Sequence, residues 1–240
     1  TVGWLGFANA PLRRHLMQVF SRPFGDTGSF LADPTFEAVF GWAPSSRLMR
    51  DLAGNLLTPS VVIAMDSPPT ELADEYRFAK DRAPYAHQLQ AWEILAQQPA
   101  KSLIVTSGTG SGKTECFMVP ILDRLAREQA ELGSQLVGVR ALFLYPLNAL
   151  INSQRDRLSA WTHGFGNKIR FCLYNGLTPE TVPAHARAPA GSEVKDRRTL
   201  RAAPPPILVT NATMLEYMLV RAQDASILEK SSGKLEWIVL

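Results

Sequence analysis

Residues 107–117, SGTGSGKTECF, decide the fold of this chain. Glycines stand at positions 108, 110 and 112, and Lys-Thr follows the last of them. The apolar run LIV at 103–105 comes just before this stretch, and a helical pattern covers residues 113–129. When a glycine-rich loop joins a buried strand to a helix, its successive backbone N–H groups form a cradle for an anion. The pattern therefore predicts a loop that holds the phosphates of a nucleotide.

The residues of this loop have separate expected roles. Glycine adopts backbone conformations that other residues resist and lets a phosphate approach the chain closely. The Lys113 side chain would reach the β- and γ-phosphates, and the Thr114 hydroxyl would coordinate Mg²⁺. We therefore predict that both residues take part in catalysis and that Thr114 is the metal ligand, through the nucleotide. A flexible glycine–serine turn is the alternative. The residues predicted to bind the nucleotide here are Ser107, Gly108, Thr109, Gly110, Ser111, Gly112, Lys113, Thr114 and Glu115.

The first position of the motif departs from the general phosphate-loop pattern, because Ser107 stands where that pattern has glycine. A small residue followed by x-T-G-S-G-K-T resembles motif I of the superfamily 2 helicases, the DEAD/DEAH-box group. The resemblance covers roughly residues 83–240. It implies ATP and Mg²⁺ as cofactors, and an ATP-dependent helicase in which two RecA-like lobes close on ATP and open after hydrolysis.

A second motif lies upstream, in PYAHQLQAW at residues 84–92. Gln88 precedes Lys113 by 25 residues, and in helicases of this superfamily a glutamine in this place reads the edge of adenine. A side-chain amide can do so because it carries both a donor and an acceptor. The alternative is an ordinary residue on the surface of a helix. Tyr85 or Arg82 would stack on the base, and the sequence does not choose between them.

Two further segments resemble the helicase motifs that contact nucleic acid. Residues 145–154, YPLNALINSQ, resemble motif Ia, where Pro146, Asn148 and Gln154 are our candidates. Short polar side chains and helix-start N–H groups bind phosphate without sequence preference. The alternative is a loop cap followed by an ordinary helix residue.

Residues 209–219, VTNATMLEYML, resemble motif Ib, in which Thr210 and Asn211 stand between a strand and a helix. Ala212 and Thr213 replace the usual Pro-Asp of this motif. Gly176, in YNGLTP, falls where this superfamily carries a glycine-containing loop and is a further candidate for nucleic-acid contact.

Strand and helix patterns alternate through the second part of the chain, which predicts a mainly parallel sheet with crossover helices. We therefore expect an α/β fold, with a RecA-like P-loop NTPase domain over residues 77–240. The expected strands are 102–107, 140–146, 169–175, 206–210 and 235–240, and the expected helices are 87–97, 113–129, 147–161 and 211–222.

Residues 1–76 have a different pattern and predict a small, mostly helical extension and linker. A helix over residues 10–20 would start at Asn9 with Pro11 in its first turn. A second, over residues 45–57, would be capped by Ser45 or Ser46. Residues 65–76, MDSPPTELADEY, are expected to be a linker because two prolines interrupt them.

The composition fits a protein with a hydrophobic core, at 46% hydrophobic and 20% charged residues. No apolar run reaches the length of a membrane span, and Cys116 and Cys172 provide neither a disulfide framework nor metal-ligand spacing. We expect a cytoplasmic protein with no membrane partner. The basic cluster KDRRTLR at 195–201 faces nucleic acid or, alternatively, is a solvated helix face. The five tryptophans are expected to pack in the core or between domains, namely Trp4, Trp42, Trp92, Trp161 and Trp237.

The last expected strand, at 235–240, is the one that delivers the acidic Walker B pair in the helicases it resembles. We expect this pair, and a second RecA-like lobe, to follow Leu240 in a larger motor. Without the acidic pair, Mg²⁺ lacks a ligand and the attacking water lacks its orienting base. The 240 residues alone are therefore expected to bind ATP weakly and not to hydrolyse it efficiently.

The leading functional hypothesis is an ATP-dependent helicase or translocase on DNA. An RNA helicase is the main rival, and the preference for DNA follows from likeness to the Lhr-like group. An ATP-gated scaffold that clamps a partner without unwinding is a rival of another class. Residues 31–42 and 52–65 also resemble segments of very large bacterial helicases, including anti-phage defence proteins of the Druantia and DISARM type. This implies a role in defence, with partner subunits.

Overall fold

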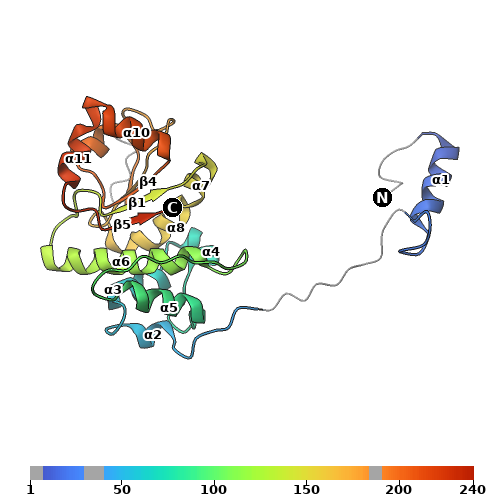
Figure 1. Cartoon of the computed structure of the whole chain (residues 1–240), viewed down its shortest axis with the longest axis horizontal. Coiled ribbons are helices and arrows are strands. Elements are labelled where there is room, and N and C mark those ends of the chain that lie inside the picture. Colours follow the sequence, from blue (N-terminus) through green and yellow to red (C-terminus); the bar gives the residue numbers. More distant parts are fainter. Residues whose placement is uncertain (1–7, 30–40, 184–190) are drawn as a thin grey trace. The chain divides into compact units, whose positions relative to one another are not determined.

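The computed structural model describes residues 8–29, 41–183 and 191–240. The chain forms two compact units, Thr1–Gly41 and Trp42–Leu240. In the first, helix α1 (Ala10–Phe20) begins as the sequence predicts, because the Asn9 side chain accepts a hydrogen bond from Leu12 N at 3.0 Å and a proline occupies the first turn. The second unit contains the sheet (Figure 1).

Five parallel strands form this sheet, in the order β3-β2-β4-β1-β5. The three inner strands of this order are buried on both faces, which explains their continuous apolar runs. The expected strands at 140–146, 169–175, 206–210 and 235–240 are confirmed, and β3 is an addition. The strands are β1 (Ala141–Leu144), β2 (Phe171–Leu173), β3 (Glu193–Val194), β4 (Ile207–Thr210) and β5 (Trp237–Val239).

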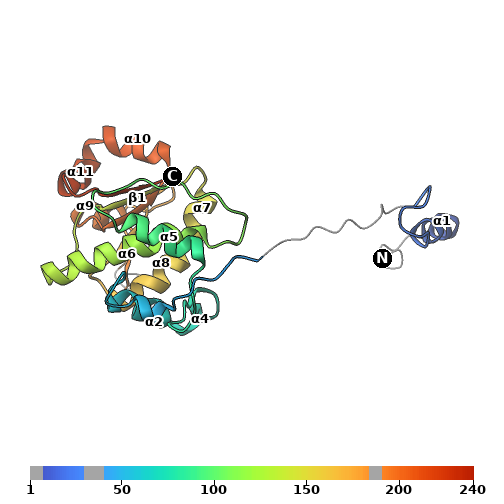
Figure 2. The same cartoon turned by 60° about the horizontal axis from the view of Figure 1, so that its bottom comes forward.

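Successive residues of each strand point to opposite faces, so the sheet separates two apolar clusters. Phe143, Phe171 and Val209 belong to the cluster beneath α6 (Lys113–Leu132) and α8 (Arg155–Thr162). Cys172 and Leu208 belong to the cluster beneath α10 (Ala212–Val220) and α11 (Ala225–Ser231). Figures 1 and 2 show these two pairs of helices on opposite sides of the sheet. The predicted α/β architecture with helices on both faces is confirmed.

The helices of the second unit are more numerous than the sequence indicates. The expected helix at 147–161 is interrupted at Gln154, which ends one helix and begins the next. The helices are α2 (Met49–Leu52), α3 (Pro59–Asp66), α4 (Thr70–Tyr76), α5 (Ala86–Leu95), α6 (Lys113–Leu132), α7 (Asn148–Ser153), α8 (Arg155–Thr162), α9 (Arg197–Ala202), α10 (Ala212–Val220) and α11 (Ala225–Ser231), with 3₁₀ turns η1 (His163–Phe165) and η3 (Ala222–Asp224).

The strand predicted at residues 102–107 is wrong, because residues 101–108 carry no regular secondary structure. Leu103 and Val105 pack on the core while Ile104 is 87% exposed, so the alternation of a strand is present. None of the five strands of the described sheet pairs with this segment. Apolar alternation reports burial, but a strand also needs a neighbour for its backbone N–H and C=O groups.

Two predictions about the region before residue 77 are also wrong. The helix expected over 45–57 is only α2, begins after Leu48 and has no serine cap. The linker expected at 65–76 contains α4, which starts directly after Pro69. Tyr76 at its end packs against the main core. The compact second unit thus begins at Trp42, whereas the sequence places the boundary near Arg77.

Candidate functional site

The glycine-rich loop between residue 107 and α6 has the backbone of an anion cradle. Gly110 and Gly112 have φ of +79° and +73°, values that disfavour any residue with a Cβ. The Lys113 ammonium donates hydrogen bonds to Ser107 O and Gly108 O, both at 2.9 Å. A positive side chain is therefore held over the loop, at the N-terminus of a 20-residue helix. Both features favour a bound anion.

Helix α5 is hydrogen-bonded to this loop through two neighbouring side chains. Gln88 Oε1 accepts from Tyr85 N at 2.8 Å, and Gln88 Nε2 donates to Gly112 O at 3.1 Å. The ring N–H of His87 donates to Ser111 O at 2.8 Å. Gln88 is only 2% exposed, so the alternative of an ordinary surface residue is wrong. Its amide retains one further donor and one further acceptor.

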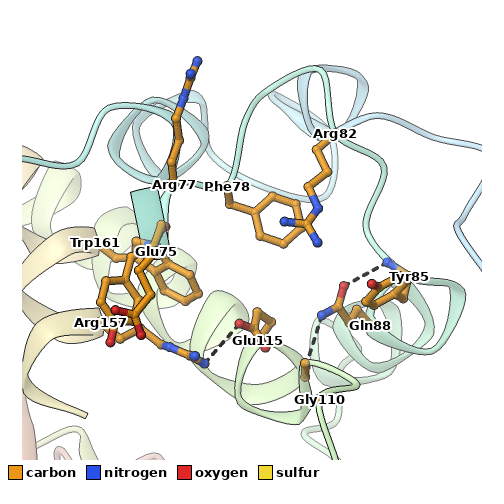
Figure 3. Close-up of a pocket in the computed structure, with 12 residues that line it drawn as sticks. Glu75, Arg77, Phe78, Arg82, Tyr85, Gln88, Gly110, Glu115, Arg157 and Trp161 are labelled. Carbon is orange, nitrogen blue, oxygen red and sulfur yellow. Dashed lines mark hydrogen bonds and ion pairs between the residues drawn. The ribbon is translucent and has the colours of Figure 1, made fainter. Parts of the chain in front are cut away.

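A cavity of about 140 Å³ lies beside the loop. Arg82 places its guanidinium 5.1 Å from the centre of the Phe78 ring, and Tyr85 stacks on His87 with 5.7 Å between ring centres. The structure thus brings both candidates for base stacking, Tyr85 and Arg82, to the same cavity. Figure 3 shows its lining residues, which are Glu75, Tyr76, Arg77, Phe78, Arg82, Tyr85, Gln88, Gly110, Gly112, Glu115, Arg157 and Trp161.

Glu115 and Arg157 form an ion pair at the edge of this cavity, with 3.0 Å between Oε1 and a guanidinium nitrogen. Arg157 also lies 5.7 Å from the ring centres of Tyr76 and Trp161. The second carboxylate oxygen, Glu115 Oε2, is buried and has no hydrogen-bond partner within the described parts of the chain. A buried carboxylate oxygen without a donor is costly, and a ligand with an N–H group would satisfy it.

Sequence reasoning missed six of the residues that line the cavity, namely Glu75, Tyr76, Arg77, Phe78, Arg157 and Trp161. Phe78 stands outside the quoted motif, Arg157 follows the motif Ia segment, and Trp161 was assigned only to packing. Trp161 does pack, since it is 2% exposed and donates from its indole N–H to Tyr76 O at 2.8 Å. No sequence signal places Arg157 here, because its position depends on how α8 packs against α3 and α4.

The predicted nucleic-acid residues lie where the parallel strands end. Asn148 is the first residue of α7, after β1, and Asn211 caps α10, after β4. Because β1 and β4 are neighbours, these two helix starts meet, and Asn211 Nδ2 donates to Asn148 Oδ1 at 3.0 Å. Pro146 is exposed just before this pair. Thr210 is fully buried and its hydroxyl donates to Tyr174 O at 2.6 Å.

Gly176 lies in a separate exposed turn after β2. The turn is held by hydrogen bonds within residues 175–178, including Asn175 Oδ1 with Leu177 N at 2.9 Å. A cavity of about 480 Å³ opens beside it and is also lined by Asn152 and Lys195. Gln154 belongs to neither of these places, because it lies at the junction of α7 and α8. The structure therefore groups Asn148 with Asn211, and places Gly176 in a different loop.

The basic cluster at 195–201 belongs largely to α9 and makes contacts within the protein. Arg197 donates to Thr178 O at 2.8 Å, and Arg201 donates to the fully buried carboxylate of Asp224 at 2.8 Å. Burial acts to lower the pKa of Arg201, but its hydrogen bond to the Asp224 carboxylate and the negative charges of Asp224 and Glu180 outweigh this and raise the pKa. Neither reading of this cluster from sequence anticipated these buried contacts.

Other predicted features have mixed outcomes. Trp92 is 1% exposed and donates from its indole N–H to Glu115 O at 2.9 Å, so its assignment to the core is confirmed. Trp4 and residues 31–40 lie outside the described residues. Cys116 and Cys172 are both buried free thiols. No helix in the described ranges is both long and apolar enough to cross a bilayer.

Comparison with known proteins identifies relatives that share only part of their length with this chain. It is 40% identical over 111 residues to Druantia protein DruE of Escherichia coli strain UMEA 4076-1, covering 40% of this chain and 6% of the relative. It is 29% identical over 103 residues to the uncharacterized ATP-dependent helicase YprA of Bacillus subtilis strain 168, covering 43% of this chain and 12% of that protein. The chain thus spans a small part of both.

The fold has a counterpart among solved structures. The crystal structure of the DUF1998 helicase MrfA bound to DNA superposes with a TM-score of 0.53 and 23% identity, over 82% of this chain and 21% of that one. The sequence profile of the DEAD/DEAH box helicase family matches residues 85–240. This range contains the glycine-rich loop, the sheet, Gln88 and the predicted nucleic-acid residues. The chain belongs to the DEAD/DEAH box helicase family.

Proposed function

We propose that this chain is the ATP-binding lobe of an ATP-dependent helicase or translocase that moves along DNA. One observation carries the proposal. The loop at residues 107–113 holds a lysine ammonium between two of its own carbonyl oxygens, at the start of a long helix and beside a cavity with aromatic walls. Membership of a helicase family supports the same conclusion.

The residues around the loop fit Mg²⁺·ATP. A Cβ on Gly112 would lie 2.2 Å from Gln88 Nε2, so only glycine at this position lets the loop pack against the Gln88 amide. Lys113 would exchange its two loop carbonyls for phosphate oxygens, and the Thr114 hydroxyl would hold the metal. The nucleotide supplies the phosphoanhydride: the lobes would close on bound ATP and open after its hydrolysis.

The paired helix starts at Asn148 and Asn211 would hold the nucleic-acid backbone. Their amide groups and the first backbone N–H groups of α7 and α10 are donors suited to phosphate oxygens. Such contacts carry no base preference, which suits an enzyme that moves along any sequence. Binding should weaken as salt rises, because phosphate contacts release counterions.

DNA and a defence role are the finer parts of the proposal. The similarity to Druantia protein DruE supports the defence role, as does the resemblance of this chain to large bacterial defence helicases. The preference for DNA follows from the likeness to the Lhr-like group. No contact described above requires a 2′-hydroxyl, the group that distinguishes RNA from DNA. An RNA helicase and an ATP-gated scaffold remain the two rival functions, and we place the protein in the cytoplasm with partner subunits of a defence system.

Nucleic-acid binding by the chain tests this proposal. The polarisation of labelled single-stranded DNA and of RNA of matched sequence is measured with the wild type, with Asn148→Ala/Asn211→Ala, and with the control Asn55→Ala, an exposed asparagine elsewhere. We expect tighter binding to DNA, a loss of at least about fivefold in the double variant, and no change in the control. Equal binding by all three proteins would contradict the assigned surface.

Hydrolysis separates a motor from a scaffold. It is measured in a protein that joins residues 1–240 to an acidic Walker B pair and a second RecA-like lobe, because both are required for turnover. Stimulation by DNA supports the motor. Hydrolysis that depends on Lys113 and ignores DNA and RNA alike would support the scaffold instead.

A further inference from the structure

We infer that Glu115 selects the base of the nucleotide by accepting a hydrogen bond from the 6-amino group of adenine. This inference rests on the proposed nucleotide site and adds a specificity-determining residue to it. The predicted reader of adenine is Gln88, and Glu115 is predicted only as one of the loop residues that bind the nucleotide.

The shape of the cavity suits a flat heteroaromatic ring joined to phosphates on the loop. Gly110 and Gly112 form part of its wall, so a ligand whose phosphates lie on the loop can continue into the cavity. Phe78 and Tyr85 supply aromatic faces, and the guanidinium of Arg82 lies beside them (Figure 3). Aromatic faces and guanidinium planes are the surfaces on which nucleobases stack.

Two polar groups converge at one side of this cavity. A Cβ built on Gly112 would lie 2.2 Å from Gln88 Nε2 and 2.9 Å from Glu115 Oε2, so both atoms lie against the same face of this glycine. Gln88 Nε2 has a second hydrogen to donate, since only one is used toward Gly112 O. Glu115 Oε2 has lone pairs and, among the described residues, no donor. A donor and an acceptor therefore stand side by side.

Adenine presents the complementary pair, an amino group that donates next to a ring nitrogen that accepts. A base with a 6-oxo group in the same pose would set its lone pairs against those of the carboxylate. A site built to bind one hydrogen-bonding group discriminates strongly against an analogue that lacks it, because the buried polar atom is left unpaired. Glu115 thus favours ATP over a 6-oxo purine nucleotide.

Arg157 is the positioning residue for this contact. Its guanidinium carries donors only and binds Oε1 of Glu115 at 3.0 Å, which leaves Oε2 as the oxygen available to the base. The aromatic rings of Tyr76 and Trp161, both 5.7 Å away, hold the guanidinium in place. The ion pair therefore fixes which oxygen of the carboxylate a ligand meets.

The substitution Glu115→Gln gives the sharpest test. Arg157 would hold the oxygen of the new amide, so the amide NH₂ would take the place of Oε2 and become a donor. We expect the wild type to bind ATP at least about tenfold more tightly than ITP, which differs at position 6. In Glu115→Gln this preference should reverse. Glu115→Asp moves the carboxylate away from the base while keeping its charge, and should therefore bind ATP and ITP with nearly equal affinity.

Calorimetric titration of the full chain with Mg²⁺·ATP, Mg²⁺·ITP and inorganic tripolyphosphate supplies the controls. Tripolyphosphate affinity should be the same in the wild type and both Glu115 variants, because tripolyphosphate carries no base. The matched control is Glu128→Gln, which disturbs another ion pair of α6, with Arg140, and should leave the ATP-to-ITP ratio unchanged.

The outcomes distinguish this inference from the proposed function. An unchanged ATP-to-ITP ratio in both Glu115 variants would overturn the base-selecting role while the phosphate site stands. Equal binding of ATP, ITP and tripolyphosphate by the wild type and Lys113→Ala would overturn the nucleotide site itself, and this inference with it. Reversal in Glu115→Gln, with loss of binding in Lys113→Ala, supports both.

Discussion

Gly112 joins the loop to α6 and has two reasons to be glycine. Its φ is +73°, and a Cβ would collide with the Gln88 amide at 2.2 Å. We predict that Gly112→Ala lowers the free energy of unfolding by at least about 2 kcal/mol, from the left-handed backbone and the collision together. Urea denaturation of the full chain measures this.

Gly133 provides the matched control, because its φ is +66° and nothing lies within 4 Å of a Cβ built there. Gly133→Ala should cost only about 1 kcal/mol, the conformational part alone. Equal costs at the two positions would show that the contact between Gly112 and Gln88 has no energetic importance.

Cys116 should resist alkylation in the native protein. Burial, with a smaller contribution from the charge of Glu115, raises the pKa of its thiol to about 11. The thiolate, which is the reactive form, is therefore scarce below that pH. At pH 8 we predict a reaction with iodoacetamide at least about a hundredfold slower than in urea, followed by mass spectrometry of the peptide. A native rate near the unfolded rate would contradict the burial of this thiol.

At the scale of residues, the sequence predicts what the motif itself contains. The loop glycines, Lys113 and Gln88 are adjacent in space as the motif implies. The partner of Glu115 is unpredictable from sequence. Arg157 stands 42 residues further along the chain, on another helix, and reaches Glu115 only through tertiary packing. Side chains that meet only through tertiary packing leave no local pattern.

Among the elements, α6 connects the loop to the helices that precede it in the chain. Asp123, on this helix and 7% exposed, accepts from Thr58 N at 2.5 Å and from Arg127 at 2.7 Å. We predict that Asp123→Ala lowers the free energy of unfolding by about 2 kcal/mol, since the start of α3 loses a buried acceptor.

Glu131 is the control for this prediction, because it is exposed on the same helix. Glu131→Ala should change the stability by less than about 0.5 kcal/mol. Thermal or urea unfolding that gave both variants the same stability would show that the link from α6 to α3 is not an important one.

Strand and helix prediction succeeded where a segment has a neighbour and a continuous apolar face. Residues 141–144 and 207–210 pair with each other and are strands, as their apolar runs predict. Residues 102–107 have a similar run and no strand beside them in the described sheet. The break at Gln154 was also invisible, since the apolar spacing continues through it. Pairing and helix breaks depend on the tertiary surroundings, which the local pattern does not contain.

For the molecule as a whole, the structure places a compact unit at Trp42–Leu240. Helices α2 and α3 and the residues between them contribute side chains to its core that are at most 1% exposed, namely Met49, Leu52, Leu57, Val61 and Met65. The sequence assigned these to an extension because prolines and glycines interrupt them. Proline and glycine mark where helices and strands end, but they do not show which segments pack into the same core.

Two truncations test this boundary. Removal of residues 1–41 should leave the stability of the rest unchanged within about 0.5 kcal/mol. Removal of residues 1–76 should prevent folding, because each lost core side chain costs about 2–5 kcal/mol and a domain has only about 5–15 kcal/mol in total. Circular dichroism and urea titration compare them. If residues 77–240 folded on their own, the domain boundary would lie near Arg77, as the sequence predicts, and not at Trp42.

The most direct test of the central claim is the affinity of the full chain for Mg²⁺·ATP, measured by calorimetry with wild type, Lys113→Ala and the control Lys101→Ala. Lys101 is exposed and lies before the loop, so Lys101→Ala removes one positive charge, as Lys113→Ala does, without changing the loop. We predict that Lys113→Ala weakens binding at least about tenfold, whereas Lys101→Ala binds as the wild type does. Equal affinity in all three proteins would contradict the assignment of residues 107–114 as the nucleotide site.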